Sequence, residues 1–117
     1  MNNKIIESKN LTKILFNLKK KNKKSVLVHG VFDLLHLGHI EHFKEAKSYG
    51  DVLFVSITCD KFVNKGFNKP YFSENQRAKF LESIQFIDYV IINNFPSSTP
   101  IIKKIKPNFY FKGPDYK

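Results

Sequence analysis

Two histidines three residues apart, His36 and His39, enclose a glycine in the run His36-Leu37-Gly38-His39. Imidazole N–H groups donate to phosphate oxygens, and the backbone N–H groups at the start of a helix bind anions without any side chain. Nucleotidyl transfer needs such fixed donors, because an acceptor oxygen attacks the α-phosphate of a nucleoside triphosphate and negative charge builds up before pyrophosphate leaves. The pair therefore predicts phosphate chemistry that depends on positioning and charge rather than on a covalent nucleophile.

Other residues near this pair suit the same chemistry. Gly30, Asp33 and Gly38 lie in the same short stretch, and glycines let a backbone approach a phosphate closely, although Gly30 could equally mark a turn. A histidine pair could also be half of a zinc site, but no second pair of ligands at zinc spacing accompanies it, so we expect no metal ligands on the protein. His29 and His42 are expected to be structural or solvated. The motifs of phosphate-loop kinases and of dinucleotide-binding dehydrogenases do not occur.

Apolar periodicity predicts the elements that must position these residues. Helices are expected over 11–18, 38–49, 73 onward and 100–105, and strands over 25–31, 52–58, 89–92 and 109–112, with a loop over 60–72. Ser73 and Gln76 form a capping-box pattern, and Phe80, Leu81 and Ile84 are expected to face inward. Strands that alternate with helices predict a single α/β domain, with a parallel sheet covered on both faces and ligands at the carboxyl ends of its strands.

Composition narrows the possible partners and surroundings. The chain has 20 basic and 10 acidic residues, a formal charge of +10, but Arg77 is its only arginine, and the lysine, isoleucine and asparagine content is typical of AT-rich coding sequence. We therefore expect no nucleic-acid partner. The single cysteine, Cys59, reads as a buried apolar residue in a reducing compartment. No apolar stretch is long enough to cross a bilayer and no secretory leader is evident, so we expect a cytoplasmic protein without a membrane partner.

The run from Gly30 to His39 resembles the signature of the cytidylyltransferase-like nucleotidyltransferase family, which includes glycerol-3-phosphate cytidylyltransferase and the heptose-phosphate adenylyltransferases. Further matches keep the order and spacing of that family from Ser25 onward. They are Asp60 after the second strand, Lys65 in the loop, Arg77 after Ser73-Glu74-Asn75-Gln76, Asp88 before the third strand, and Lys112-Gly113-Pro114-Asp115-Tyr116.

The resemblance implies a Rossmann-like fold, often dimeric, and magnesium-dependent transfer from CTP or ATP to a phosphorylated sugar or polyol, with the magnesium carried by the triphosphate. It implies that His36 and His39 stabilise the transition state, and that Lys65 and Arg77 meet phosphate charges. The loop residues Gly30, Val31, Phe32, Asp33 and Gly38, with Asp60, would shape the nucleotide and phosphate pocket. Lys112, Gly113 and Asp115 would lie beside the base and ribose, a pattern nearer to the adenylyltransferase branch.

Segment 1–24 is expected to be a leading helix and a lysine-rich turn, and 25–117 the nucleotidyltransferase domain. Family members continue into another strand and a Ser/Thr-rich helix start, whereas this sequence stops at Lys117. The alternative interpretation is therefore a module that binds a nucleotide without turning it over. A class I aminoacyl-tRNA synthetase also uses a His-x-Gly-His loop, but it needs a far longer chain and a Lys-Met-Ser-Lys-Ser loop. The acceptor, and CTP against ATP, stay open.

Overall fold

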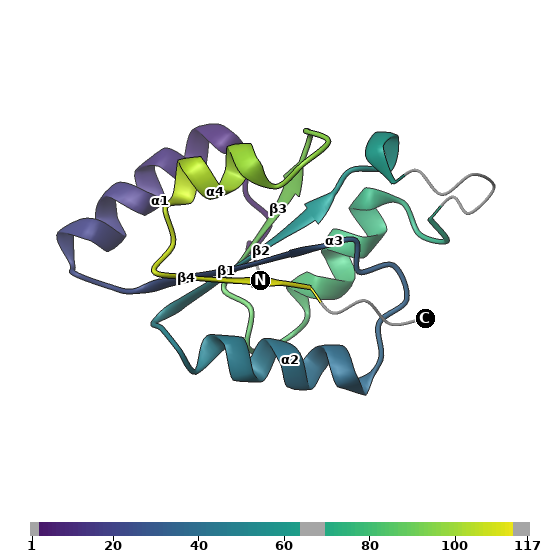
Figure 1. The fold of residues 1–117 in the computed structure, drawn as a ribbon, viewed down its shortest axis with the longest axis horizontal. Helices are drawn as coiled ribbons and strands as arrows, with labels where there is room; N and C mark the ends of the chain where they lie inside the picture. Colours follow the sequence, from purple (N-terminus) through teal and green to yellow (C-terminus); the bar gives the residue numbers. More distant parts are fainter. Residues whose placement is uncertain (1–2, 64–69, 114–117) are drawn as a thin grey trace.

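The computed structural model describes residues 3–63 and 70–113 and shows a four-stranded parallel sheet (Figure 1). The strands are β1 (Ser25–Gly30), β2 (Val52–Thr58), β3 (Tyr89–Asn93) and β4 (Phe109–Lys112), in the order β3-β2-β1-β4. β1 is central, pairing Val28 with Val55 of β2 and with Phe111 of β4. Because all strands are parallel, their carboxyl ends meet at one edge of the sheet, where the predicted phosphate chemistry would take place.

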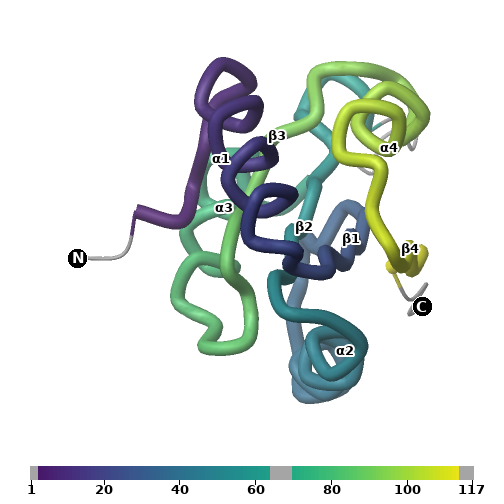
Figure 2. Tube along the Cα trace, turned by 90° about the vertical axis from the view of Figure 1, so that its left-hand side faces the viewer, coloured from purple at the N-terminus to yellow at the C-terminus, as the bar shows by residue number. Residues whose placement is uncertain are grey.

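Helices cover both faces of the sheet, as predicted. They are α1 (Ser8–Lys20), α2 (Leu37–Lys47), α3 (Glu74–Glu82) and α4 (Thr99–Ile105), with one turn of 3-10 helix, η1 (Asp60–Phe62), inside the expected loop. On one face Phe43 of α2 and Leu81 of α3 pack against β1 and β2. On the other face Leu11 of α1 and Ile105 of α4 pack against Leu27, and the two layers are visible on either side of the sheet in Figure 2. The single α/β domain predicted from the alternation is confirmed.

The start of α3 confirms one local prediction and corrects another. The Ser73 hydroxyl accepts from the Gln76 N–H at 3.2 Å, and the Gln76 side-chain oxygen accepts from the Ser73 N–H at 3.1 Å, which completes the capping box. The prediction that Phe80 faces inward is wrong, because its side chain is 43% exposed and packs edge-on against Phe72. Arg77, one turn earlier, is fully buried instead.

The first described residues extend the sheet at its β3 edge. Val90 donates from its N–H to the carbonyl of Lys4 at 2.8 Å and accepts from the N–H of Ile6 at 2.9 Å. The helix that follows is anchored by Leu11, which is buried between α4 and the sheet. Segment 4–20 is therefore packed onto the same core as the strands.

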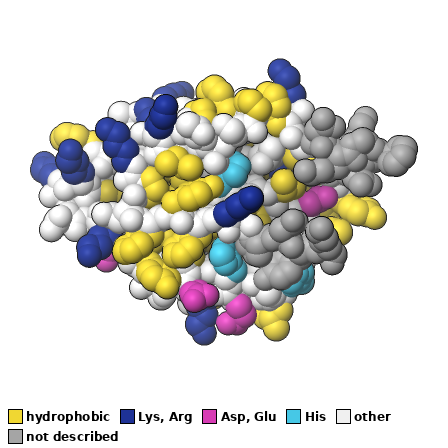
Figure 3. Space-filling view, viewed as in Figure 1, with side chains coloured by type: hydrophobic (Ala, Val, Ile, Leu, Met, Phe, Trp, Pro, Cys, Tyr) yellow, Lys and Arg dark blue, Asp and Glu magenta, His cyan; other side chains and the backbone are white. Residues whose placement is uncertain are grey.

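Among the residues that the structure describes, lysines lie at several places on the face drawn in Figure 3. Several gather at the end of the molecule formed by α1 and the turn that follows it, on the left of Figure 3. Among residues 3–63 and 70–113, no helix has both the length and the apolar character needed to span a bilayer.

Candidate active site

The histidine loop connects the carboxyl end of β1 to the first turn of α2. His36 is the N-cap residue of α2, and its Nδ1 accepts from the backbone N–H of Gly38 at 3.0 Å. In turn, the Nδ1 of His39 accepts from the backbone N–H of His36 at 3.1 Å. The two imidazoles therefore close a reciprocal cap, in which each satisfies a helix-start donor that would otherwise lack an intrahelical partner.

This cap determines where the ring protons lie. A backbone N–H can only donate, so the Nδ1 atoms of both His36 and His39 act as acceptors and carry no proton. In the neutral form each ring must then hold its proton on Nε2. The two rings lie 4.4 Å apart between centroids. The loop thus contains two neighbouring imidazoles whose Nε2–H groups are donors, at a helix terminus whose dipole favours anions.

The surroundings of His39 favour its neutral form. Only 5% of the residue is exposed, and this burial lowers the pKa of the imidazole below its ordinary value, with smaller contributions from the nearby His36 and His42. Burial disfavours the charged form of a histidine, so His39 is a neutral donor near pH 7.

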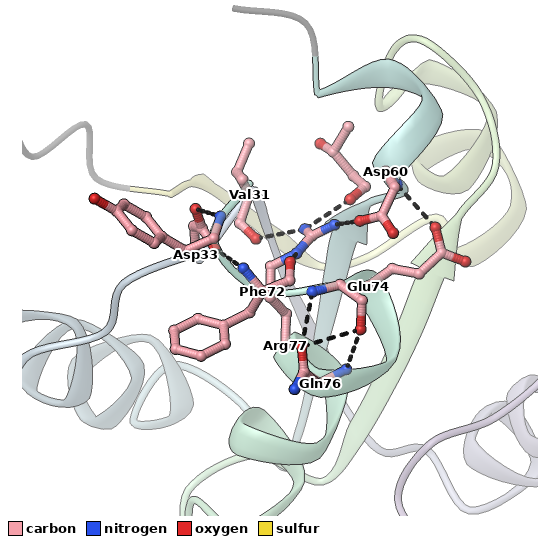
Figure 4. A network of polar contacts seen from close by, with 10 residues as sticks. Val31, Asp33, Asp60, Phe72, Glu74, Gln76 and Arg77 are labelled. Carbon is pink, nitrogen blue, oxygen red and sulfur yellow. Dashed lines mark hydrogen bonds and ion pairs between the residues drawn. The ribbon is translucent and has the colours of Figure 1, made fainter. Parts of the chain in front are cut away.

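Arg77 is a buried connection between the loops at the carboxyl edge of the sheet (Figure 4). The Nη1 atom donates to the carbonyls of Val31 and Thr58 at 2.9 and 2.8 Å, and Nε donates to the carbonyl of Phe72 at 3.0 Å. Nη2 donates to the Asp60 carboxylate at 2.7 Å, which completes an ion pair. The structure does not support the expected direct contact of Arg77 with a phosphate, because the guanidinium is fully buried and directed at four protein acceptors.

The two carboxylates of the loops also bind protein groups. The Asp33 oxygens accept from the backbone N–H groups of Tyr71 and Phe72 at 2.7 and 2.9 Å, and so fix the segment that leads into α3. Asp60 accepts from Arg77, and its own backbone N–H donates to Glu74 at 2.8 Å (Figure 4). Both residues lie at the carboxyl edge as expected, and both act there by holding loops in place.

Strand β4 brings Lys112 and Gly113 beside the end of β1. Lys112 is exposed and lies opposite His29 in the register, and the Gly113 N–H donates to the His29 carbonyl at 2.7 Å. Lys65 and Asp115 fall outside the described residues. Asp88 lies at the opposite edge of the sheet, where its carboxylate accepts from the Leu53 N–H at 2.8 Å.

Sequence reasoning missed the role of Glu74 at this edge, and it expected His29 to be structural or solvated without naming its partner. Glu74 holds the backbone of Asp60, although a first-turn glutamate ordinarily indicates only a favourable helix dipole. His29 forms a polar pair inside the sheet, with its Nδ1 2.6 Å from the hydroxyl oxygen of the buried Ser56, and burial lowers its pKa. The alternation of polar residues at 29, 56 and 58 within otherwise apolar strands was the available signal.

An apolar groove of about 540 Å³ runs beside His36, between the histidine loop and α3. Leu37, Phe72 and Phe80 line it, which explains why Phe80 is exposed on a helix whose other apolar residues face the core. Among the described residues, no group of three or more histidines, cysteines and carboxylates is arranged to hold a metal ion.

Comparison with known proteins identifies the family. The sequence pattern described as cytidylyltransferase-like matches residues 27–117. The bifunctional protein HldE of Aliarcobacter butzleri is 41% identical over 110 residues, which cover 91% of this chain and 23% of that protein. HldE of Campylobacter jejuni strain RM1221 is 40% identical over 111 residues, which cover 93% of this chain and 24% of that protein. The chain thus spans about a quarter of the length of these curated relatives.

A solved structure agrees with the sequence matches. The lipopolysaccharide core biosynthesis protein of Thermoplasma volcanium GSS1 is similar with a TM-score of 0.70 and 32% identity, over 75% of this chain and 72% of that chain. The matched sequence includes the histidine loop, the buried arginine and the end of β4. The chain belongs to the cytidylyltransferase-like family.

Proposed function

We propose that this chain is a nucleotidyltransferase domain that transfers AMP or CMP from ATP or CTP to a phosphorylated sugar or polyol and releases pyrophosphate. The observation that carries the proposal is the reciprocal cap, which fixes the tautomers of His36 and His39 so that each has an Nε2–H donor at the start of α2. Family membership supports the reaction class. The similarity to a lipopolysaccharide core biosynthesis protein favours a sugar phosphate as acceptor.

The chemistry follows from the donors. An oxygen of the acceptor forms a new bond to the α-phosphorus, while the bond from that phosphorus to the bridging oxygen of pyrophosphate breaks. Negative charge grows on the α-phosphate and bridging oxygens, and the Nε2–H groups of His36 and His39 would donate to them there. Because the donors are already oriented by the cap, little reorganisation is needed as the charge develops.

Magnesium belongs to this proposal as an ion that arrives on the triphosphate and neutralises part of its charge. The carboxylates of Asp33 and Asp60 are committed to protein donors, so they do not form a ready ligand set. Lys112 and Gly113 would lie beside the base and ribose. A cytoplasmic location and a homodimer remain predictions from the sequence.

The test is pyrophosphate release with ATP and with CTP, in magnesium, across phosphorylated sugars and polyols. His39→Ala removes one donor and should lower kcat about 100-fold or more. His42→Ala is the matched control, because this histidine lies on the same helix outside the cap. Release that depends on one acceptor and is lost only in His39→Ala supports the transferase. Triphosphate binding without release from any acceptor contradicts it and favours the nucleotide-binding module.

A further inference from the structure

Phe32, in the histidine loop, has an unusual backbone conformation. Its φ of 52° lies in the left-handed region, which residues with a side chain adopt rarely. Both neighbours are anchored: the Val31 carbonyl accepts from Arg77, and the Asp33 carboxylate accepts from the N–H groups before α3. Such strain persists only where the surroundings hold it, and here it directs the Phe32 side chain back into the protein, where 5% of the residue is exposed.

The tip of the Phe32 ring occupies space that two glycines leave empty. A Cβ atom added to Gly30 would lie 2.9 Å from the ring atoms Cε2 and Cζ, and one added to Gly113 would lie 2.8 Å from Cζ. Contacts this short are not tolerated, so both positions must be glycine while the ring stays where it is. Gly30 ends β1 and Gly113 follows β4, so one ring touches the ends of two paired strands.

The same ring also packs against the helix that carries the catalytic pair. The centroids of Phe32 and His39 are 6.0 Å apart, with the rings nearly perpendicular, and Phe43 lies 5.1 Å away on the next turn. An edge-to-face arrangement at this distance is favourable and stabilises the observed orientation of the two rings. His39 is therefore held by its cap at Nδ1 and by the Phe32 ring on one side.

We propose that Phe32 is a positioning residue, which sets the place of the His39 imidazole and couples it to the end of β4 at Gly113. The inference rests on the proposed function, since it assigns His39 a catalytic role. It links Gly113, at the end of β4, which is expected beside the base and ribose, to His39, which is expected to donate to the α-phosphate. A displacement of β4 reaches His39 through the ring, because the ring has no free volume at either glycine.

Two substitutions test the link. Phe32→Leu removes the aromatic edge while keeping an apolar side chain, and Phe32→Tyr adds an oxygen at Cζ, the atom that touches both glycines. Each should lower kcat by roughly 10- to 100-fold with a much smaller change in KM, since a small misplacement of a catalytic group costs rate rather than ground-state binding. Phe16→Leu on α1, where the side chain is 67% exposed, is the matched control and should leave both constants unchanged.

A second measurement needs no turnover. The pKa of His39 is followed by NMR in the chain without substrates, and Phe32→Leu should raise it toward the ordinary histidine value because the ring contributes to its burial. If Phe32→Leu lowers the melting temperature while kcat and the pKa of His39 stay at their wild-type values, Phe32 is merely structural and the inference is overturned. If the wild-type chain releases no pyrophosphate, the proposed function fails, and the NMR result still decides whether Phe32 positions His39.

The glycines provide a cross-check that distinguishes a specific contact from general damage. The three nearest neighbours of a Cβ at Gly30 are all atoms of the Phe32 ring, whereas a Cβ at Gly113 also meets the His29 carbonyl oxygen at 2.9 Å. Phe32→Leu should therefore restore much of the stability lost in Gly30→Ala, but little of that lost in Gly113→Ala. Equal rescue of both glycine variants, or of neither, contradicts the packing on which the inference rests.

Discussion

Replacement of Arg77 by methionine tests whether the buried guanidinium holds the site together. The substitution keeps a long apolar stem and removes hydrogen bonds to three backbone carbonyls and to Asp60. The carbonyls belong to the half-buried Val31, Thr58 and Phe72, so water can replace part of what is lost. Asp60 has a side chain 44% exposed, and its ion pair is discounted for that reason.

We therefore expect Arg77→Met to lower the free energy of unfolding by about 4 kcal/mol, because each of the three hydrogen bonds from the charged guanidinium to a carbonyl contributes about 1.5 kcal/mol and the half-exposed Asp60 adds little. Such a loss is large for a domain whose total stability is expected to be about 5–15 kcal/mol. Arg77→Lys should cost about 2 kcal/mol, because a single ammonium cannot span acceptors that the planar guanidinium reaches in three directions.

Urea unfolding followed by circular dichroism measures both variants. A loss of about 4 kcal/mol corresponds to a midpoint lower by roughly 2 M or more for a domain of this size. Lys79→Met is the matched control, since its side chain lies on the same helix and is 75% exposed, and it should change stability by less than about 0.5 kcal/mol. A loss below about 1 kcal/mol in Arg77→Met would refute the structural role and reopen the contact with phosphate.

The titration of His39, the Asp33 contacts and the α3 cap each give a measurable effect. The reaction rate should fall as the pH drops through the lowered pKa of His39, because protonation at Nδ1 breaks the cap, and a pH–rate profile checks this. The same lowered pKa makes a contribution to the free energy of unfolding that is fully present above about pH 6.5, the ordinary histidine pKa, and is lost at lower pH. Unfolding measured across this pH range checks it. A stability profile that does not fall as the pH drops below about 6.5 would contradict this. Asp33→Asn leaves one acceptor oxygen for two N–H groups, so amide exchange at Tyr71 or Phe72 should speed up, and unchanged protection at both would count against it. Ser73→Ala removes the α3 cap and should cost about 1 kcal/mol in urea unfolding, with a loss near zero showing that the capping box is not formed in solution.

The sequence predicted the elements well because their signals are local. The strand expected over 25–31 forms Ser25–Gly30, and the capping pattern at Ser73 and Gln76 marks the start of α3 within one residue. Both features depend on neighbours within a few positions, where apolar periodicity and cap chemistry operate. The parallel topology followed from the alternation of elements.

Features that depend on residues distant in the chain could not be predicted from the sequence. Phe80 has helical spacing with Leu81 and Ile84, yet it lines a groove beside the histidine loop, because periodicity does not reveal which side of a helix has a neighbour. Arg77 was expected to contact phosphate because of its place in a family motif, and the motif does not show that its side chain is buried. The backbone pairing of Lys4 and Ile6 with Val90 was also missed, because residues 4–6 carry no strand pattern although the strand over 89–92 was predicted.

The fold joins segments that lie far apart in the chain, and this has a consequence for folding kinetics. The Ser25 N–H donates to the Asn108 side chain across 83 residues, and the Lys4 N–H donates to Glu82 across 78. Contacts of such high sequence separation raise the contact order, and chains dominated by them fold in milliseconds to seconds rather than microseconds. During synthesis the central strand β1 emerges before β4, and it lacks this partner until residue 112 has left the ribosome. The histidine loop should accordingly acquire its final geometry late, in a step shared with the last strand.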